Sequence, residues 1–121
     1  MIRGFENILS PLNDTDKRVL VPALADLLHW RKGRNLAITN TELRKQLAER
    51  GYTVGDAKLR ALVNYIRING VVERLIATSQ GYFVAVSGTE LADYCDSLRE
   101  REAAIRAVRQ ALEGQNTKSL F

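Results

Sequence analysis

Residues able to contact a nucleic acid lie together on one predicted helix, between Val54 and Gly70. Four apolar residues recur on it at helical spacing and predict a buried stripe: Leu59, Leu62, Val63 and Ile66. The opposite side collects Ala57, Ala61 and Asn64, with Lys58 and Tyr65 at its edges, while Arg60 and Arg67 flank the stripe from the other side. This pattern predicts an amphipathic helix with a small, basic and amide-bearing outer face.

Such a face suits the major groove of DNA. Asn64 can pair with two atoms of an adenine, and Lys58 or Arg60 can reach guanine or phosphate. A small residue such as Ala61 lets the helix approach the bases. The predicted recognition contacts are therefore Lys58, Arg60, Ala61, Asn64 and Tyr65. An ordinary amphipathic helix with a solvated face is the alternative.

The flanking segments predict the elements that would position this helix. Thr39 and Glu42 have the spacing of a capping box and predict a helix that ends at Gly51. Residues 71–77 and 82–86 are rich in β-branched and aliphatic residues, and Thr78-Ser79-Gln80-Gly81 between them predicts a tight hairpin. Residues 35–38 can pair with this hairpin as a short strand.

The two ends of the chain add helices. Residues 15–31 have helical spacing interrupted by Pro22, so either a short turn precedes a helix that starts near Pro22, or one helix is kinked there. Gly33 is expected to stop this helix, with Arg31 and Lys32 in its last turn. Ser87 and Glu90 form a second capping box, which predicts a long helix to about residue 113 that ends at Gly114.

The order helix, short strand, helix, turn, helix, hairpin resembles the winged-helix branch of helix-turn-helix proteins over residues 15–86. The string LRALVNYIRINGVVERLIATSQGYFVA, followed by LREREAAIRAV, resembles small phage and prophage-encoded proteins with a winged-helix domain and a C-terminal helix. The resemblance implies a mainly α fold with a small β-hairpin (α+β), and DNA binding in phage replication or gene control. The expected parts are an irregular arm (1–14), a winged-helix domain (15–86), a C-terminal helix (87–114) and a frayed tail (115–121).

Positive charge is concentrated over the predicted helix-turn-helix. The chain has a net charge of +4, but residues 30–74 carry ten basic and four acidic groups, a local +6. Such a cluster suits phosphate binding, although a solvated surface is the plainer reading. The expected phosphate contacts are Arg31, Lys32, Arg34, Thr41, Arg44 and Lys45, and the expected wing contacts are Arg74, Ser79 and Gln80. The hairpin tip has no Arg or Lys, which predicts a weak wing contact.

The last helix allows two arrangements. Its apolar positions alternate by three and four residues, with Arg101 and Glu102 at the middle step. The stripe can cover the first helix and close the core, or it can form a homodimer through Leu98, Ile105, Val108 and Leu112. A dimer would present two recognition helices to a symmetric site.

Enzymatic chemistry is not expected. The single His29 and the single Cys95 offer no catalytic pair and no zinc ligand set, and no phosphate-binding glycine loop is present. We therefore expect no cofactor, no metal and no small-molecule substrate. No apolar run is long enough to cross a bilayer, so we expect a cytoplasmic protein whose partner is double-stranded DNA. The rival function is a protein-interaction module that uses the same scaffold.

Overall fold

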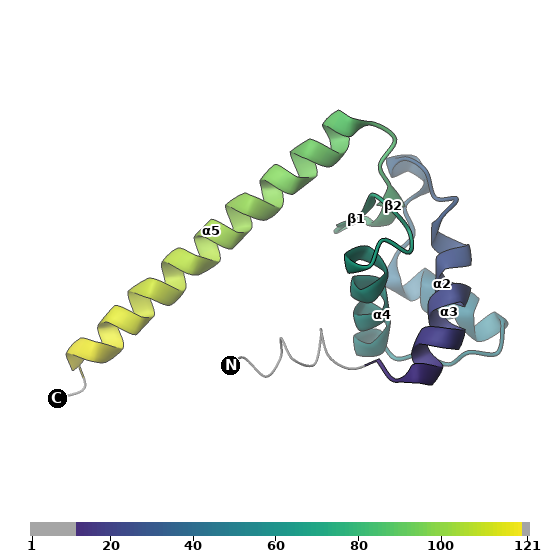
Figure 1. Cartoon of the computed structure of the whole chain (residues 1–121), viewed down its shortest axis with the longest axis horizontal. Helices are drawn as coiled ribbons and strands as arrows, with labels where there is room; N and C mark the ends of the chain where they lie inside the picture. Colours follow the sequence, from purple (N-terminus) through teal and green to yellow (C-terminus); the bar gives the residue numbers. More distant parts are fainter. Residues whose placement is uncertain (1–11, 120–121) are drawn as a thin grey trace. The chain divides into compact units, whose positions relative to one another are not determined.

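The computed structural model describes residues 12–119, with side chains through residue 116, and is mainly helical with one small antiparallel sheet (Figure 1). The chain divides into two units between Val86 and Ser87. The first unit contains η1 (Asp16–Leu20), α2 (Val21–Leu28), η2 (Arg34–Leu36), α3 (Asn40–Glu49), α4 (Asp56–Ile68), β1 (Leu75–Thr78) and β2 (Gly81–Val84). The second unit contains α5 (Gly88–Ser119). The predicted combination of helices with a small β-hairpin is confirmed.

The first helical segment is continuous and begins earlier than expected. The amide of Asp16 donates to Asn13 Oδ1 at 2.8 Å, and the Asp16 carboxylate accepts from the Asn13 amide at 3.1 Å. This reciprocal pair is a capping box. The helix therefore begins at Asp14, the last residue of the expected irregular arm, while residues 1–11 lie outside the described part of the chain.

Pro22 is accommodated by a change of helix type rather than by a break. The η1 segment is a π-helix, in which the Val21 amide donates to the Asp16 carbonyl five residues back. Proline has no amide hydrogen and its ring clashes with the carbonyl four residues earlier, so a wider turn just before Pro22 relieves both problems. The sequence predicts a short turn before a helix that starts near Pro22, or one helix kinked there; the structure has instead a π-helical segment that runs directly into α2, with Pro22 in the first turn of α2. Helix α2 ends at Leu28, so Arg31 and Lys32 lie beyond the helix and not in its last turn.

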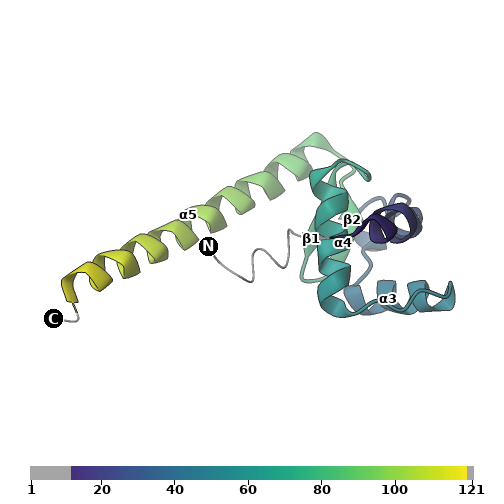
Figure 2. The same cartoon turned by 60° about the horizontal axis from the view of Figure 1, so that its bottom comes forward.

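Helices α3 and α4 follow the predicted pattern closely, and Figure 2 shows them crossing steeply. Thr39 Oγ1 accepts from the Glu42 amide at 3.2 Å, which confirms the predicted N-cap of α3. The Glu42 carboxylate accepts from Gln46, so the second half of that capping box is replaced by a contact along the helix. Gly55 caps α4 as expected.

The hairpin has a two-residue tip, Ser79 and Gln80, between the paired residues Thr78 and Gly81. The two strands are shorter than the predicted runs. Ile38 and Tyr82 exchange backbone hydrogen bonds of 3.0 and 2.8 Å, so the predicted pairing of residues 35–38 with the hairpin is confirmed at Ile38. The predicted strand is wrong at residues 35–36, which belong to the 3-10 helix η2. A Cβ atom on Gly81 would lie 2.4 Å from the Ile38 carbonyl oxygen, so only glycine permits this approach.

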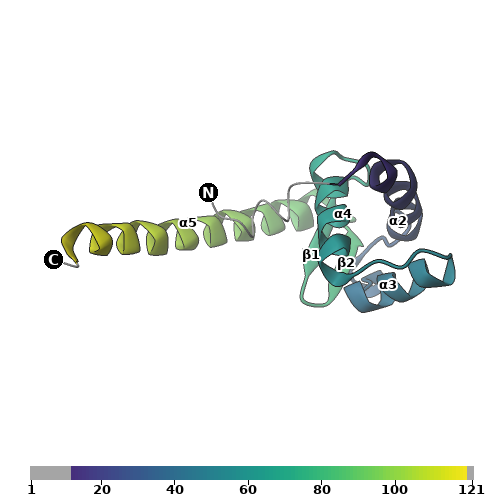
Figure 3. The same cartoon turned by 90° about the horizontal axis from the view of Figure 1, so that it is seen from below.

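The core of the first unit lies between α2, α3, α4 and the hairpin, as Figure 3 shows from below. The four residues predicted for the buried stripe of α4 are all 2% exposed or less. Leu43 and Leu47 of α3 and Leu24 and Leu28 of α2 complete its centre, each fully buried. The core therefore fixes which side of α4 faces outward.

Helix α5 continues through Gly114 to Ser119, so the predicted end at Gly114 and the frayed start of the tail are wrong. Ser87 Oγ accepts from the Glu90 amide at 3.1 Å, which confirms the predicted start. Glycine inside a helix costs about 1 kcal/mol relative to alanine, but it stops the helix only where the backbone turns to positive φ. Gly114 is not among the glycines with positive φ. Residues 120–121 lie outside the described part.

Candidate nucleic-acid interface

The exposed face of α4 contains fewer of the predicted recognition residues than expected. It lies on the side of the helix that carries Arg60. Its exposed residues are Ala57, Arg60 and, at the C-terminal end, Ile68; Asn64 and Arg67 share the same helical spacing but are only partly exposed. The Arg60 side chain is 60% exposed. The side-chain amide of Asn64 has no hydrogen-bond partner among the residues that the structure describes. The face therefore presents the exposed Arg60 guanidinium and the partly exposed Asn64 side-chain amide, which follow the small residue Ala57 along the helix.

A chain of hydrogen bonds joins this face to the hairpin and to the start of α3. The Tyr82 hydroxyl donates to Asn40 Oδ1 at 2.6 Å, and Asn40 Nδ2 donates to Asp56 Oδ1 at 3.4 Å. Arg60 then pairs with the other carboxylate oxygen of Asp56 at 2.7 Å. Since the four residues come from β2, α3 and α4, the network sets the relative position of these three elements at one surface.

The pKa of the Tyr82 hydroxyl depends on its burial and on the charged side chains around it. Burial raises the pKa of the Tyr82 hydroxyl above its ordinary value, while its hydrogen bond to Asn40 and the nearby charges of Arg60 and Arg67 oppose that rise. Two guanidinium groups therefore lie near the phenol. Arg67 is also structural, because its Nε donates to the Leu75 carbonyl at 3.1 Å where β1 begins.

A polar hollow of about 330 Å³ lies between the first turn of α3 and the hairpin. Three of its lining residues come from the helix start and the others from the hairpin: Thr39, Asn40, Thr41, Ala77, Thr78, Ser79, Gly81 and Tyr82. Helix starts carry partial positive charge and unpaired amide groups, so the hollow is open to an anionic group. Thr41, predicted as a phosphate contact, is exposed at this hollow.

Three residues of the predicted recognition face lie instead on the side of α4 covered by η1. Lys58 Nζ donates to Asp16 Oδ2 at 3.0 Å, and Ala61 is only 7% exposed. Tyr65 is half-buried, with the Lys17 ammonium 5.6 Å from its ring centroid. The predicted outward position of Ala61 is wrong, because the first helical segment packs against that side of α4. Arg60 and Asn64 remain on the exposed face.

The contact between Asp16 and Lys58 is structural in character. The Asp16 side chain is 7% exposed, whereas the Lys58 side chain is 45% exposed. The hydrogen bond from Lys58 is the main cause that holds the pKa of the Asp16 carboxyl below its ordinary value, with burial acting the other way. An ionised Asp16 thus fastens η1 to α4.

The basic cluster after α2 consists of Arg31, Lys32 and Arg34, and its two arginines make contacts within the folded domain. The Arg31 guanidinium stacks 4.1 Å from the Trp30 ring and donates to the Leu36 carbonyl at 3.4 Å. The Arg34 guanidinium lies 5.0 Å from the centroid of the Phe83 ring, and Arg34 is exposed. Lys32 is also exposed, and its backbone forms an isolated parallel β-bridge with Val84 of the hairpin. The structure does not bring this cluster into the network of Tyr82, Asn40, Asp56 and Arg60.

The remaining predicted contacts are spread over two elements. On α3, Arg44 Nε donates to the Val54 carbonyl at 2.9 Å, which fastens the turn before α4, while Lys45 is exposed. On the hairpin, Ser79 and Gln80 are exposed at the tip, and the Gln80 amide donates to Thr78 Oγ1 at 3.1 Å. Arg74 is exposed and holds a φ of 61° just before β1.

Sequence reasoning missed the polar network of Tyr82, Asn40 and Asp56. One signal was present: in a strand that contains the buried Phe83, alternation turns Tyr82 to the other face. The pairing of Asn40 with Tyr82 joins residues 42 positions apart, so spacing alone does not reveal it.

Other kinds of site find no support in residues 12–119. No group of three His, Cys, Asp or Glu side chains suited to a metal ion occurs there. None of the helices described is both long enough and apolar enough to cross a membrane. The chain matches no protein-family model, no curated protein and no solved structure.

Proposed function

We propose that this protein binds double-stranded DNA as a winged-helix protein and inserts the exposed face of α4 into the major groove. The observation that carries the proposal is that face itself, where Arg60 and Asn64 stand beside the small residue Ala57. Arginine pairs with guanine and asparagine with adenine at base edges, and a small residue allows close approach. The biological role that fits is a phage-type transcription regulator or replication accessory protein.

Arg60 can change partners without a large cost. Its pair with Asp56 is exposed, and such pairs contribute about 1 kcal/mol or less. A phosphate or a guanine offers the guanidinium a comparable or better geometry, because two parallel hydrogen bonds can form. The internal pair therefore holds the side chain in place until DNA arrives.

The neighbouring elements supply the backbone contacts that such a helix needs. The hollow beside Thr41 presents the start of α3 and the hairpin hydroxyls on either side. Contacts to phosphate position a protein on the duplex, and amide groups at a helix start serve that purpose. Lys45, further along α3, and the local charge of +6 over residues 30–74 add electrostatic attraction.

Fluorescence anisotropy with labelled duplex DNA tests the proposal. At low salt we expect saturable binding, with an affinity that falls by roughly one logarithmic unit per phosphate contacted for each tenfold rise in salt. Arg60→Gln together with Asn64→Ala should weaken binding at least about tenfold.

Arg50→Gln is the control, because it removes one arginine charge at the C-terminal end of α3, away from the polar hollow, where the guanidinium lies 3.9 Å from the Asp26 carboxylate. Equal losses from the control and from the α4 variant would contradict a role for the α4 face. No binding at micromolar protein would remove the proposal altogether.

The rival function is a protein-interaction module, and one observation favours it. Ile68 and Val71, at the end of α4, are 70% and 46% exposed. Exposed apolar side chains near one another suit a protein partner better than a phosphate backbone. If the Ile68→Ser variant still binds DNA with an unchanged salt dependence, the result favours DNA binding over the protein-interaction function.

A further inference from the structure

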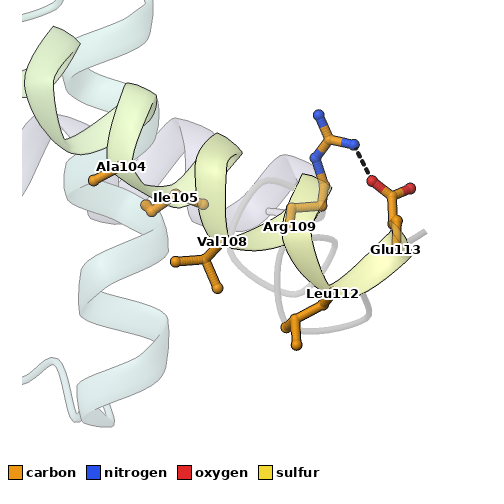
Figure 4. Close-up of a pocket in the computed structure, with 6 residues that line it drawn as sticks. All are labelled: Ala104, Ile105, Val108, Arg109, Leu112 and Glu113. Carbon is orange, nitrogen blue, oxygen red and sulfur yellow. Dashed lines mark hydrogen bonds and ion pairs between the residues drawn. The ribbon is translucent and has the colours of Figure 1, made fainter. Parts of the chain in front are cut away.

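Helix α5 carries an apolar stripe with a seven-residue repeat. Leu98, Ile105 and Leu112 are seven residues apart, and Val108 lies three residues after Ile105. These side chains are 39%, 70%, 57% and 59% exposed in the order Leu98, Ile105, Leu112, Val108. Figure 4 shows Ile105, Val108 and Leu112 on one side of the helix, where they line a shallow hollow together with Ala104, Arg109 and Glu113. A repeat of seven is the spacing of a coiled coil.

We propose that α5 pairs with α5 of a second copy of this chain in an antiparallel two-stranded coiled coil. The proposal goes beyond DNA binding and does not depend on it. In heptad terms, Leu98, Ile105 and Leu112 occupy the a positions, and Arg101, Val108 and Gln115 occupy the d positions.

The inner polar residues select the direction of pairing. In a parallel pair, each d residue meets its own copy, so two Arg101 guanidinium groups would face one another in the seam. In an antiparallel pair, a positions meet d positions. Ile105 then faces Val108 of the other copy, and Arg101 faces Leu112, along which its stem can lie while its charge reaches solvent.

The charges beside the seam select the register. Glu102 and Arg109 both occupy e positions, which face each other in an antiparallel pair. When Ile105 lies opposite Val108, Glu102 lies opposite Arg109, and this happens twice by symmetry. A slip by one heptad in either direction brings Glu102 against Glu102, or Arg109 against Arg109. Like charges at these positions are unfavourable, so only the centred register is complementary.

The ion pairs that Glu102 and Arg109 make within α5 do not prevent them from pairing with each other across the seam. Glu102 pairs with Arg106 at 3.3 Å and Arg109 pairs with Glu113, each within one exposed helix turn. Such pairs are weak and their acidic and basic groups can share a second partner. On the other edge of the seam lie Ala104 and Ala111, which are small enough for the helices to approach closely.

Sedimentation of the full chain at low salt, from about 5 to 200 µM, tests the dimer, since this range detects dissociation constants in the micromolar range. Glu102→Arg alone, or Arg109→Glu alone, should raise the dimer dissociation constant about tenfold. The double variant should restore dimerisation, although it leaves both intrahelical pairs repulsive. Circular dichroism of each variant shows whether α5 remains helical.

A distance measurement reads the direction without any substitution. Cys95 is exposed and is the single cysteine of the chain, so a spin label attaches there alone. The antiparallel pair places the two labels about 35 Å apart, from a rise of about 1.5 Å per residue, whereas a parallel pair places them within about 15 Å. A monomer at 200 µM would overturn the proposal. So would the short distance, or a double variant that dimerises no better than either single one.

Discussion

The contact between Lys58 and Asp16 should stabilise the fold rather than bind DNA. Lys58 Nζ lies 3.0 Å from a carboxylate whose side chain is 7% exposed. A hydrogen bond to a buried charged group contributes about 1.5–3 kcal/mol, and the 45% exposure of the Lys58 side chain reduces that figure to about 1 kcal/mol. Lys58→Met should therefore lower the free energy of unfolding by about 1 kcal/mol at pH 7, with a fall in Tm of about 4–8 °C.

The effect should depend on pH in one direction. The folded-state pKa of Asp16 lies below its value of 3.8 in the unfolded chain, mainly because of the hydrogen bond from Lys58. A lowered pKa contributes stability that is fully present above the unfolded value and is lost as the pH falls through the folded value. The difference between wild type and Lys58→Met should be constant from pH 7 to about 5 and shrink below pH about 4.

Urea unfolding followed by far-UV circular dichroism at several pH values measures both quantities. Lys45→Met is the control, since Lys45 is an exposed lysine of α3, and it should change stability by less than about 0.5 kcal/mol. The reasoning fails if Lys58→Met is no more destabilising than this control, or if its effect persists unchanged below the pH at which Asp16 is protonated. Lys58→Met should also bind DNA within about threefold of wild type, once its folded fraction is matched by temperature.

Three further substitutions test the framework around the site. Gly81→Ala should lower the free energy of unfolding by about 2–4 kcal/mol in a urea titration, because its Cβ would lie 2.4 Å from the Ile38 carbonyl oxygen at a φ of 122°; a change below 0.5 kcal/mol would contradict the close approach. Tyr82→Phe should cost about 1 kcal/mol by removing the 2.6 Å bond to Asn40, and an unchanged Tm would show that the network contributes nothing. Gly114→Ala should raise the helical circular dichroism signal and stabilise α5 by about 0.5–1 kcal/mol, whereas a loss of helicity would mean that glycine is required there.

Local signals predicted the parts of the fold that local physics decides. The Thr39 and Ser87 caps, the Gly55 start of α4 and the two-residue hairpin tip depend on residues within a few positions of one another. The buried stripe of α4 followed from helical spacing. Each of these features is confirmed because no distant partner competes with it.

The orientation of the candidate site could not be predicted in the same way. A helical wheel places the outer face opposite the core stripe, and it assigns Ala61 to that face. A second contact, from η1, covers Ala61 and leaves Arg60 exposed to solvent. The contact joins Asp16 to Lys58, 42 residues apart, and therefore leaves no periodic trace. The spacing of apolar residues predicted helix α4, whereas tertiary packing determines which of its polar residues are exposed.

The claim that the exposed face of α4 contacts DNA is tested most directly by mapping the contact residue by residue. An amide ¹H–¹⁵N NMR titration with a short duplex reports every backbone amide at once. We predict that the shifts gather on residues 39–41, on Ala57, Arg60 and Asn64, and at the hairpin tip, and leave α2 and the end of α3 near Glu49 unchanged. Shifts confined to other surfaces, or none at saturating duplex, would contradict the account.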